Sequence, residues 1–159
     1  MTLQFLNPKE TKEILKKLKD QFGIKKVNGS LVKRGKERLF LYQGSIGENT
    51  IKKMEYNYFN IERVGTYFAK IIQERDKEVI RLSMEGTHLF KDQINKNIFE
   101  ITNEKDLETW MHGSELNIAS GLKGFVVMKY KGDFLGCGKA SAEKITNFIP
   151  KSRRLKIKN

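Results

Sequence analysis

The sequence GFVVMKYKGDFLGCGKAS, residues 124–141, contains two apolar segments separated by a short polar turn. Residues 124–130 are rich in β-branched and aromatic side chains, which favour a buried strand. The Lys131-Gly132-Asp133 segment is typical of a tight turn, because glycine readily adopts the positive φ angles that such turns require. The stretch therefore predicts a β-hairpin in which residues 134–141 pair with residues 124–130.

The segments on either side of this hairpin predict a small β-rich unit with one helix. Residues 97–102 have the β-branched content of a short strand, and residues 103–112 form a helix capped by Asn103 and ended by Gly113. After the hairpin, apolar and basic residues alternate over 155–158, as in a strand. Strands joined by short turns indicate a closed or half-closed barrel.

The first half of the chain predicts a mixed α/β unit, so that the whole chain is α+β. Apolar periodicity and Pro8 predict a helix over residues 8–20, with Gly23 as its C-cap. Further expected elements are strands over 24–32 and 37–43, a short helix over 48–55, and strands over 59–73 and 78–85. Within these, residues 63–72 match a helix pattern as well.

The charge of the chain is strongly positive and unevenly distributed. There are 31 Lys and Arg against 19 Asp and Glu, a net charge of +12. The last 37 residues hold ten basic and two acidic residues, so +8 of the surplus lies there. Such a surplus fits a polyanionic partner, either nucleic acid or an anionic membrane. Nucleic acid is favoured, because these cations do not have the spacing of an amphipathic helix.

The only cysteine and the glycine-rich stretch around it do not indicate catalysis. A P-loop needs four residues between its first Gly and the Gly-Lys pair, whereas five separate Gly132 from Gly138, and Ala140 follows Lys139. Cys137 lies between glycines in an apolar segment, so we expect a small packed side chain. One cysteine and two separated histidines do not suit a zinc site or an internal disulfide. We expect no cofactor and no metal.

Two other features of the sequence bear on the position of the tryptophan and on the compartment of the protein. Trp110 shares a helix face with Leu107 and Met111, which favours a core position over a base-stacking surface. The single cysteine and the charged N-terminus, without signal peptide or apolar span, predict a cytoplasmic protein.

The segment from Lys144 to Lys158 is the candidate binding surface. A run of cations is usually only a solvated face. Here the cations alternate with apolar residues, which would hold them against a core, and preorganised arginines bind phosphate in a bidentate manner. The cations and polar residues concerned include Lys144, Asn147, Lys151, Arg153 and Arg154.

Residues 124–141, followed by NFIPKSRRLK at 147–156, resemble a PUA domain, a small pseudo-barrel that binds structured RNA. One resemblance is to the Nip family of ribosome-biogenesis factors; it covers nearly the whole chain and includes residues 64–68, 80–83 and 112–114. Another is to the C-terminal RNA-binding domain of Sun-type RNA cytosine-C5 methyltransferases. The chain ending resembles that domain more, through Gly138, Lys139, Asn147, Pro150, Lys151, Arg153 and Arg154.

These resemblances imply a pre-PUA α/β domain over residues 1–93 and a PUA-like RNA-binding domain over 94–159. They imply non-catalytic binding of structured RNA, most simply ribosomal RNA during ribosome assembly or RNA modification, with assembly proteins docking on the first domain. The alternatives are a lineage-specific ribosome-associated protein and an accessory subunit of an RNA-modifying enzyme. The RNA-binding residues carried over are Lys139, Lys151, Arg153, Arg154, Asn147 and Gly113, to which the charge pattern adds Lys144.

Overall fold

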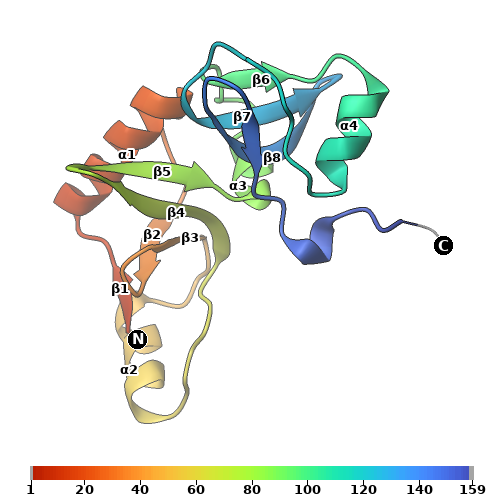
Figure 1. Ribbon diagram of the computed structural model, residues 1–159. Helices are drawn as coiled ribbons and strands as arrows, with labels where there is room; N and C mark the ends of the chain where they lie inside the picture. The colour runs from red at the N-terminus through yellow and green to blue at the C-terminus, as the bar shows by residue number, and fades with distance from the viewer. Residues whose placement is uncertain (1, 158–159) are drawn as a thin grey trace.

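The computed structural model describes residues 2–157, and it contains two β-sheets with helices packed against them (Figure 1). The first sheet is antiparallel throughout, in the order β1 (Leu3–Phe5), β2 (Ser30–Arg34), β3 (Arg38–Tyr42), β4 (Thr66–Glu74) and β5 (Lys77–Leu82). The second has the order β6 (Ile98–Glu100), β7 (Gly124–Tyr130), β8 (Asp133–Ala140) and β9 (Ile145–Asn147). The predicted α+β class is confirmed.

Over residues 2–157, four α-helices and one 3-10 helix accompany the sheets. They are α1 (Pro8–Phe22), α2 (Glu48–Asn57), α3 (Met84–Leu89), α4 (Glu104–Met111) and η1 (Lys151–Arg153). Among residues 2–157, no helix is both long enough and apolar enough to cross a membrane.

Helix α1 confirms the helix predicted from residue 8, with two residues more at its end. The side chain of Asn7 accepts a hydrogen bond from the Glu10 amide, and the Glu10 carboxylate accepts one from the Asn7 amide, so the first turn is capped reciprocally. Gly23 ends the helix at φ 82°. These two caps fix both ends of α1.

Several predicted strand boundaries in the first half are wrong. Residues 24–29 do not pair in the sheet, because the Lys25 and Lys26 amides donate to the side chain of Gln93 instead of to a strand. Residues 59–65 are also irregular, and the strand predicted over 78–85 ends at Leu82. There the Ser83 hydroxyl accepts a hydrogen bond from the Gly86 amide and begins α3.

The second sheet forms around the predicted hairpin. Strands β7 and β8 are antiparallel and turn at Lys131 and Gly132, which have φ angles of 44° and 86°. Strand β6 pairs with β7 in parallel, and Leu116 forms a bridge to Ile145 of β9. The bridge extends the sheet by one residue pair beyond β9, so the strand order is linear among the described residues and the predicted barrel closure stays a prediction. The strand predicted over 155–158 is wrong for residues 155–157, which lie outside the sheet, while Lys158 lies outside the described residues.

A shared core joins the two sheets. Leu18, Phe68, Ile80 and Leu82 from the first half pack in one cluster with side chains of the second sheet, namely Phe125, Val127, Phe134 and Cys137. Burial raises the pKa of the Cys137 thiol to about 12, so it stays protonated at neutral pH. The prediction that Cys137 is a packed side chain is confirmed.

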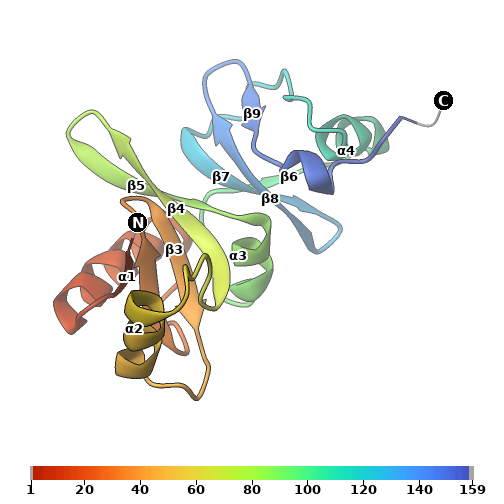
Figure 2. The same ribbon diagram turned by 90° about the horizontal axis from the view of Figure 1, so that it is seen from below.

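Helix α3 lies at the junction of the two sheets (Figure 2). Gly86 approaches β4 so closely that a Cβ atom there would lie 2.1 Å from the carbonyl oxygen of Phe68. Two residues further along the helix, Nε2 of His88 is 2.8 Å from the Phe134 carbonyl oxygen of β8. The helix therefore holds the two sheets in one arrangement.

Candidate nucleic-acid interface

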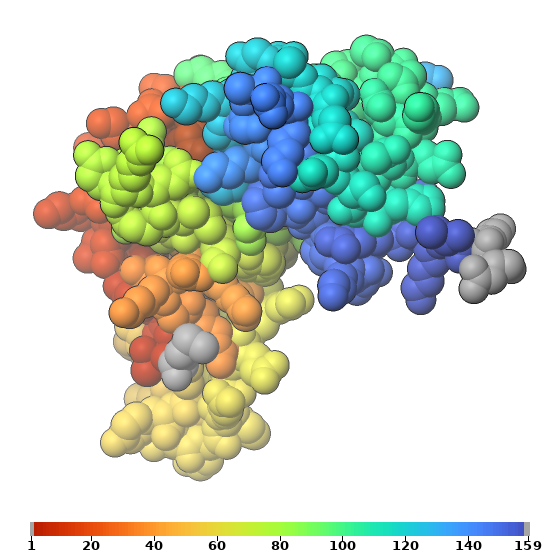
Figure 3. Space-filling view, viewed as in Figure 1, coloured from red at the N-terminus to blue at the C-terminus, as the bar shows by residue number. Residues whose placement is uncertain are grey.

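The predicted binding residues after β9 lie on a segment that projects from the second sheet (Figure 3). Pro150 precedes η1, whose residues Lys151, Ser152 and Arg153 are exposed, while Arg154 is half-buried. The Leu155 amide donates to the Met111 carbonyl at the end of α4, which ties the segment to that helix.

Arg154 is held in a fixed position over Gly113. Its Nε donates to the Ile149 carbonyl at 2.9 Å, and a Cβ atom on Gly113 would lie 2.3 Å from the Arg154 Cδ. Gly113 also has φ 92°, which favours glycine. Among the described residues, the two terminal nitrogens of Arg154 make no hydrogen bond, so they can donate to an external acceptor.

Asn147 braces this region from within. Its Nδ2 donates to the carbonyls of Trp110 and Ser114 at 2.8 and 3.0 Å, and its Oδ1 accepts from the Ile149 amide at 2.7 Å. The side chain therefore joins the end of α4 to the start of the projecting segment. Its hydrogen-bonding groups are used inside the protein, which suits a positioning role.

Three of the predicted cations form ion pairs. Lys139 of β8 lies 2.7 Å from Glu74 of β4, and Arg153 pairs with Glu85 of α3. The Nζ of Lys144 is 3.0 Å from an oxygen of Glu115. Two of these carboxylates belong to the first half of the chain. The pairs therefore reduce the positive charge that the second half presents.

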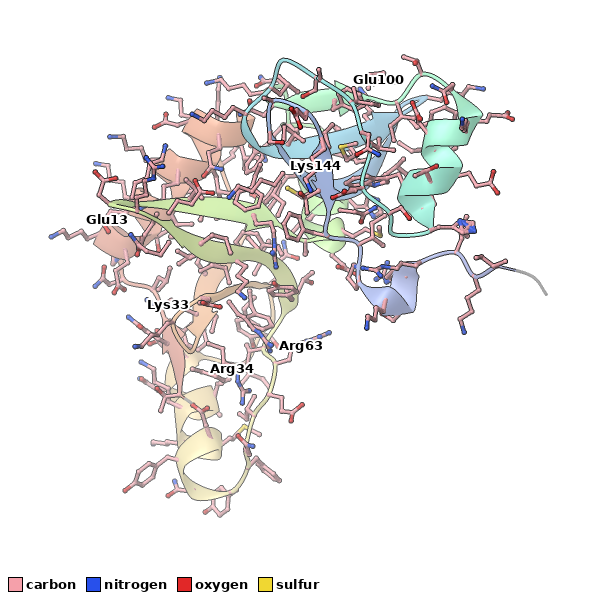
Figure 4. The ribbon with its side chains drawn as sticks, viewed as in Figure 1. Glu13, Lys33, Arg34, Arg63, Glu100 and Lys144 are labelled. Carbon is pink, nitrogen blue, oxygen red and sulfur yellow. The ribbon has the colours of Figure 1, made fainter. Side chains whose placement is uncertain are left out.

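The structure brings five of the seven predicted residues together. Gly113, Asn147, Lys151, Arg153 and Arg154 gather where α4 ends and η1 begins. The other two lie apart from this group. Lys139 lies within β8, and Lys144 lies just before β9 (Figure 4), whereas η1 comes after β9.

A groove of about 690 Å³ adjoins η1, between α4 and the projecting segment. Its lining combines cations with the exposed side chains of Leu155 and Ile157. Lys105 and His112 were not predicted as neighbours of the binding segment, because Lys105 lies in α4 and His112 is its C-cap, about forty to fifty residues earlier in the chain. Helical spacing is the signal that could have identified them. Residues 105, 109 and 112 are four and three residues apart, so they lie on the same side of a helix. The lining residues are Lys105, Glu108, Thr109, His112, Leu155, Lys156 and Ile157.

The chemistry of this region is that of a cationic binding surface. Residues 2–157 contain no cluster of His, Cys, Asp or Glu suited to a metal ion. The arginines and lysines offer donors to phosphate oxygens, and the open groove can admit an extended polyanion.

Comparison with known proteins relates this region to RNA modification enzymes. Residues 96–155 match the family model described as the methyltransferase RsmF PUA domain. Over 150 residues, the chain is 27% identical to ribosomal RNA small subunit methyltransferase F of Psychromonas ingrahamii. That alignment covers 92% of the chain, so it includes most of the first sheet, but the chain spans only 30% of the relative's length.

The Sun-type resemblance thus has support from two comparisons, while the Nip-type resemblance stays a prediction. Residues 96–155 are similar to the PUA domain of the Sun-type methyltransferases, and the chain as a whole is similar to part of one such enzyme.

Proposed function

We propose that the protein binds structured RNA, with ribosomal RNA as the natural class, through η1 and the adjoining end of α4. The observation that carries this proposal is Arg154, fixed over Gly113 beside the exposed Lys151 and Arg153. A preorganised cation loses little freedom when a phosphate binds it. The match to a PUA domain and the name of the ribosomal RNA methyltransferase support the choice of RNA.

We further propose that the chain is an RNA-targeting module that does no chemistry itself. It aligns with less than a third of the methyltransferase, and the thiol of Cys137 is buried and protonated. Its place would be in ribosome assembly or in modification of ribosomal RNA in the cytoplasm. Residues 1–93 would be a pre-PUA domain open to assembly proteins, and residues 94–159 the RNA-binding domain. Calorimetric titration with S-adenosylmethionine should give no heat; micromolar binding would overturn this module role.

Affinity is expected to come mainly from release of counterions. Each phosphate that is neutralised contributes roughly 0.7–0.9 to the slope of log K against log salt. If four to six phosphates are neutralised, the slope is about −3 to −5. Recognition of duplex parts would depend on shape, since side chains do not enter the narrow major groove of A-form RNA.

The double variant Arg153→Ala, Arg154→Ala tests this surface. We expect the salt slope to flatten by up to about 2, because two phosphate contacts are lost. Filter binding to ribosomal RNA fragments, over a series of KCl concentrations, measures the slope. The control variant Lys36→Ala, Lys53→Ala removes two exposed charges from the first half of the chain. An unchanged slope in the arginine variant, with its thermal midpoint preserved, would show that RNA lies elsewhere.

The substitution Glu85→Gln should strengthen RNA binding by releasing Arg153. Their ion pair is largely exposed, at 39% and 48% of the side-chain surfaces, so its release should gain about two- to five-fold in affinity at low salt. The matched control is Glu37→Gln, which makes the same change of charge beside Lys70 of β4, away from η1. Equal gains in both variants would mean that only the net charge matters, and that Arg153 does not contact the RNA.

A further inference from the structure

Helix α1 presents a row of lysines on the face opposite the core. Lys9, Lys12, Lys16 and Lys19 are spaced by three, four and three residues, so they share one side of the helix. Ile14, Leu18 and Phe22 are buried on the other side. Lys25, just beyond Gly23, continues the row. We call Lys9, Lys12, Lys16, Lys19 and Lys25 the lysine row; all five are exposed.

Ion pairs within the described residues do not neutralise the positive charge of the lysine row. Within residues 2–157, none of its members lies in an ion pair, whereas Lys17 on the flank of the same helix is 3.6 Å from Glu78. Two acidic residues of α1 lie beside the row, Glu13 (Figure 4) and Asp20, and the Glu10 carboxylate is occupied in capping the helix. This contrasts with Lys139, Lys144 and Arg153 of the second half, which are all paired.

Helix stability gives little reason for such a row, although Lys9 with Glu13 and Lys16 with Asp20 are favourable pairs at a spacing of four residues. Like charges three and four residues apart on a helix repel one another and destabilise it. The row contains three such neighbouring pairs in a sequence of eleven residues, from Lys9 to Lys19. A polyanion that binds along the helix would relieve the repulsion, which is a reason for the lysines to be gathered there.

The row is also rigid and continuous. Both ends of α1 are capped, and its buried side chains belong to the core shared with the second sheet. A shallow groove of about 450 Å³ runs along it, lined by Lys9, Lys12, Glu13, Leu15, Lys16, Lys19 and Lys25. From Lys9 to Lys19 the helix rises roughly 15 Å. The cations thus follow a line, as phosphates do along a nucleic-acid strand.

The lysine row lies apart from η1. The two lie on opposite sides of the molecule in both ribbon views (Figures 1 and 2). The end of α1 nevertheless adjoins the PUA domain, since the Asn95 amide donates to the Phe22 carbonyl and Asn97 Nδ2 donates to the Gln21 carbonyl. An RNA held at η1 would have to extend across the molecule to reach the row.

We propose that the lysine row is a second RNA-binding surface, which takes the phosphate backbone of a further segment of the same RNA. This inference rests on the proposed function of η1. It assigns to the first half of the chain a direct part in RNA binding, although that half has a net charge of only +4 over 122 residues. An anionic membrane is the competing partner.

The test compares two quadruple variants of equal charge. One is Lys9→Gln, Lys12→Gln, Lys16→Gln, Lys19→Gln, in which glutamine preserves length and helix propensity. The control is Lys36→Gln, Lys53→Gln, Lys77→Gln, Lys123→Gln, at exposed positions off the row. Filter binding at several KCl concentrations uses ribosomal RNA fragments of two sizes, single hairpins and multi-helix pieces. Circular dichroism checks that α1 remains folded.

We expect the lysine-row variant to bind multi-helix RNA with a slope flattened by about 3, and to bind single hairpins like the wild type. The control should retain most of the slope. Equal losses in the two variants, or no loss in the first, would overturn the second surface. The second RNA surface would also be overturned if the lysine-row variant lost binding to vesicles containing anionic lipid but kept its binding to RNA. Failure of the wild type to bind hairpins would instead refute the function proposed for η1.

Discussion

Replacing Trp110 by alanine is expected to lower the free energy of unfolding by about 3–5 kcal/mol. The indole is fully buried in the cluster between α4 and the second sheet, with Val126, Met128 and Ile145. Its Nε1 donates to the Leu135 carbonyl at 2.9 Å. Removal leaves a large cavity and an unpaired carbonyl. Urea unfolding followed by circular dichroism measures the loss.

The variant Trp110→Phe separates packing from hydrogen bonding. It keeps most of the ring volume but leaves the Leu135 carbonyl without its donor, which costs about 1–3 kcal/mol. The alanine variant should also lose RNA affinity, because collapse around the cavity would shift the end of α4, where the main-chain carbonyl of residue 110 accepts a hydrogen bond from Asn147. A loss of stability below about 1 kcal/mol for alanine would mean that the packing between α4 and the second sheet does not depend on the indole.

The substitution Gly86→Ala is expected to destabilise the protein by about 1–3 kcal/mol, although alanine is the better helix former. Its methyl group would lie 2.1 Å from the Phe68 carbonyl oxygen, a backbone atom that no side-chain rotation can move. Helix α3 would have to shift away from β4. Since His88 of the same helix contacts the Phe134 carbonyl, that shift would also disturb the second sheet. Thermal and urea unfolding measure the effect.

A control for this substitution is Gly47→Ala. Gly47 precedes α2 with φ −68°, and a Cβ atom there would meet nothing within 4 Å. The expected change is below about 1 kcal/mol, because the gain in backbone rigidity offsets the weaker cap. Similar effects at the two positions would contradict the close approach of α3 to β4.

Elements with strong local signals could be predicted from the sequence. The hairpin of β7 and β8 has its turn glycine, α1 has Pro8 and an apolar stripe, and α4 has Asn103 as its cap. Strand β1 was missed, because its three residues gain their stability from pairing with β2, about thirty residues away. Residues 24–29 have apolar content, but their amides are satisfied by Gln93, which no local pattern reveals.

The candidate site was less predictable than the fold. The basic run after β9 signalled where cations gather, and the structure adds which of them are held and which are paired. Glu85 is 68 residues from Arg153, so the pairing depends on α3 lying against the second sheet. Asn147 was predicted to contact RNA, yet its contacts with Trp110 and Ser114 are internal. The net charge of the first half, +4, does not reveal the lysine row, because acidic residues elsewhere in that half offset it and only the helical arrangement of α1 brings the lysines to one face.

The core common to both sheets fixes the position of one sheet relative to the other. Phe125 and Phe134 pack with Ile80 and Leu82, so neither sheet can swing relative to the other without exposing apolar surface to water. The separation and angle between η1 and α1 are then constants of the protein. An RNA that touched both would be selected by the distance between its own helical segments, with no base having to be recognised.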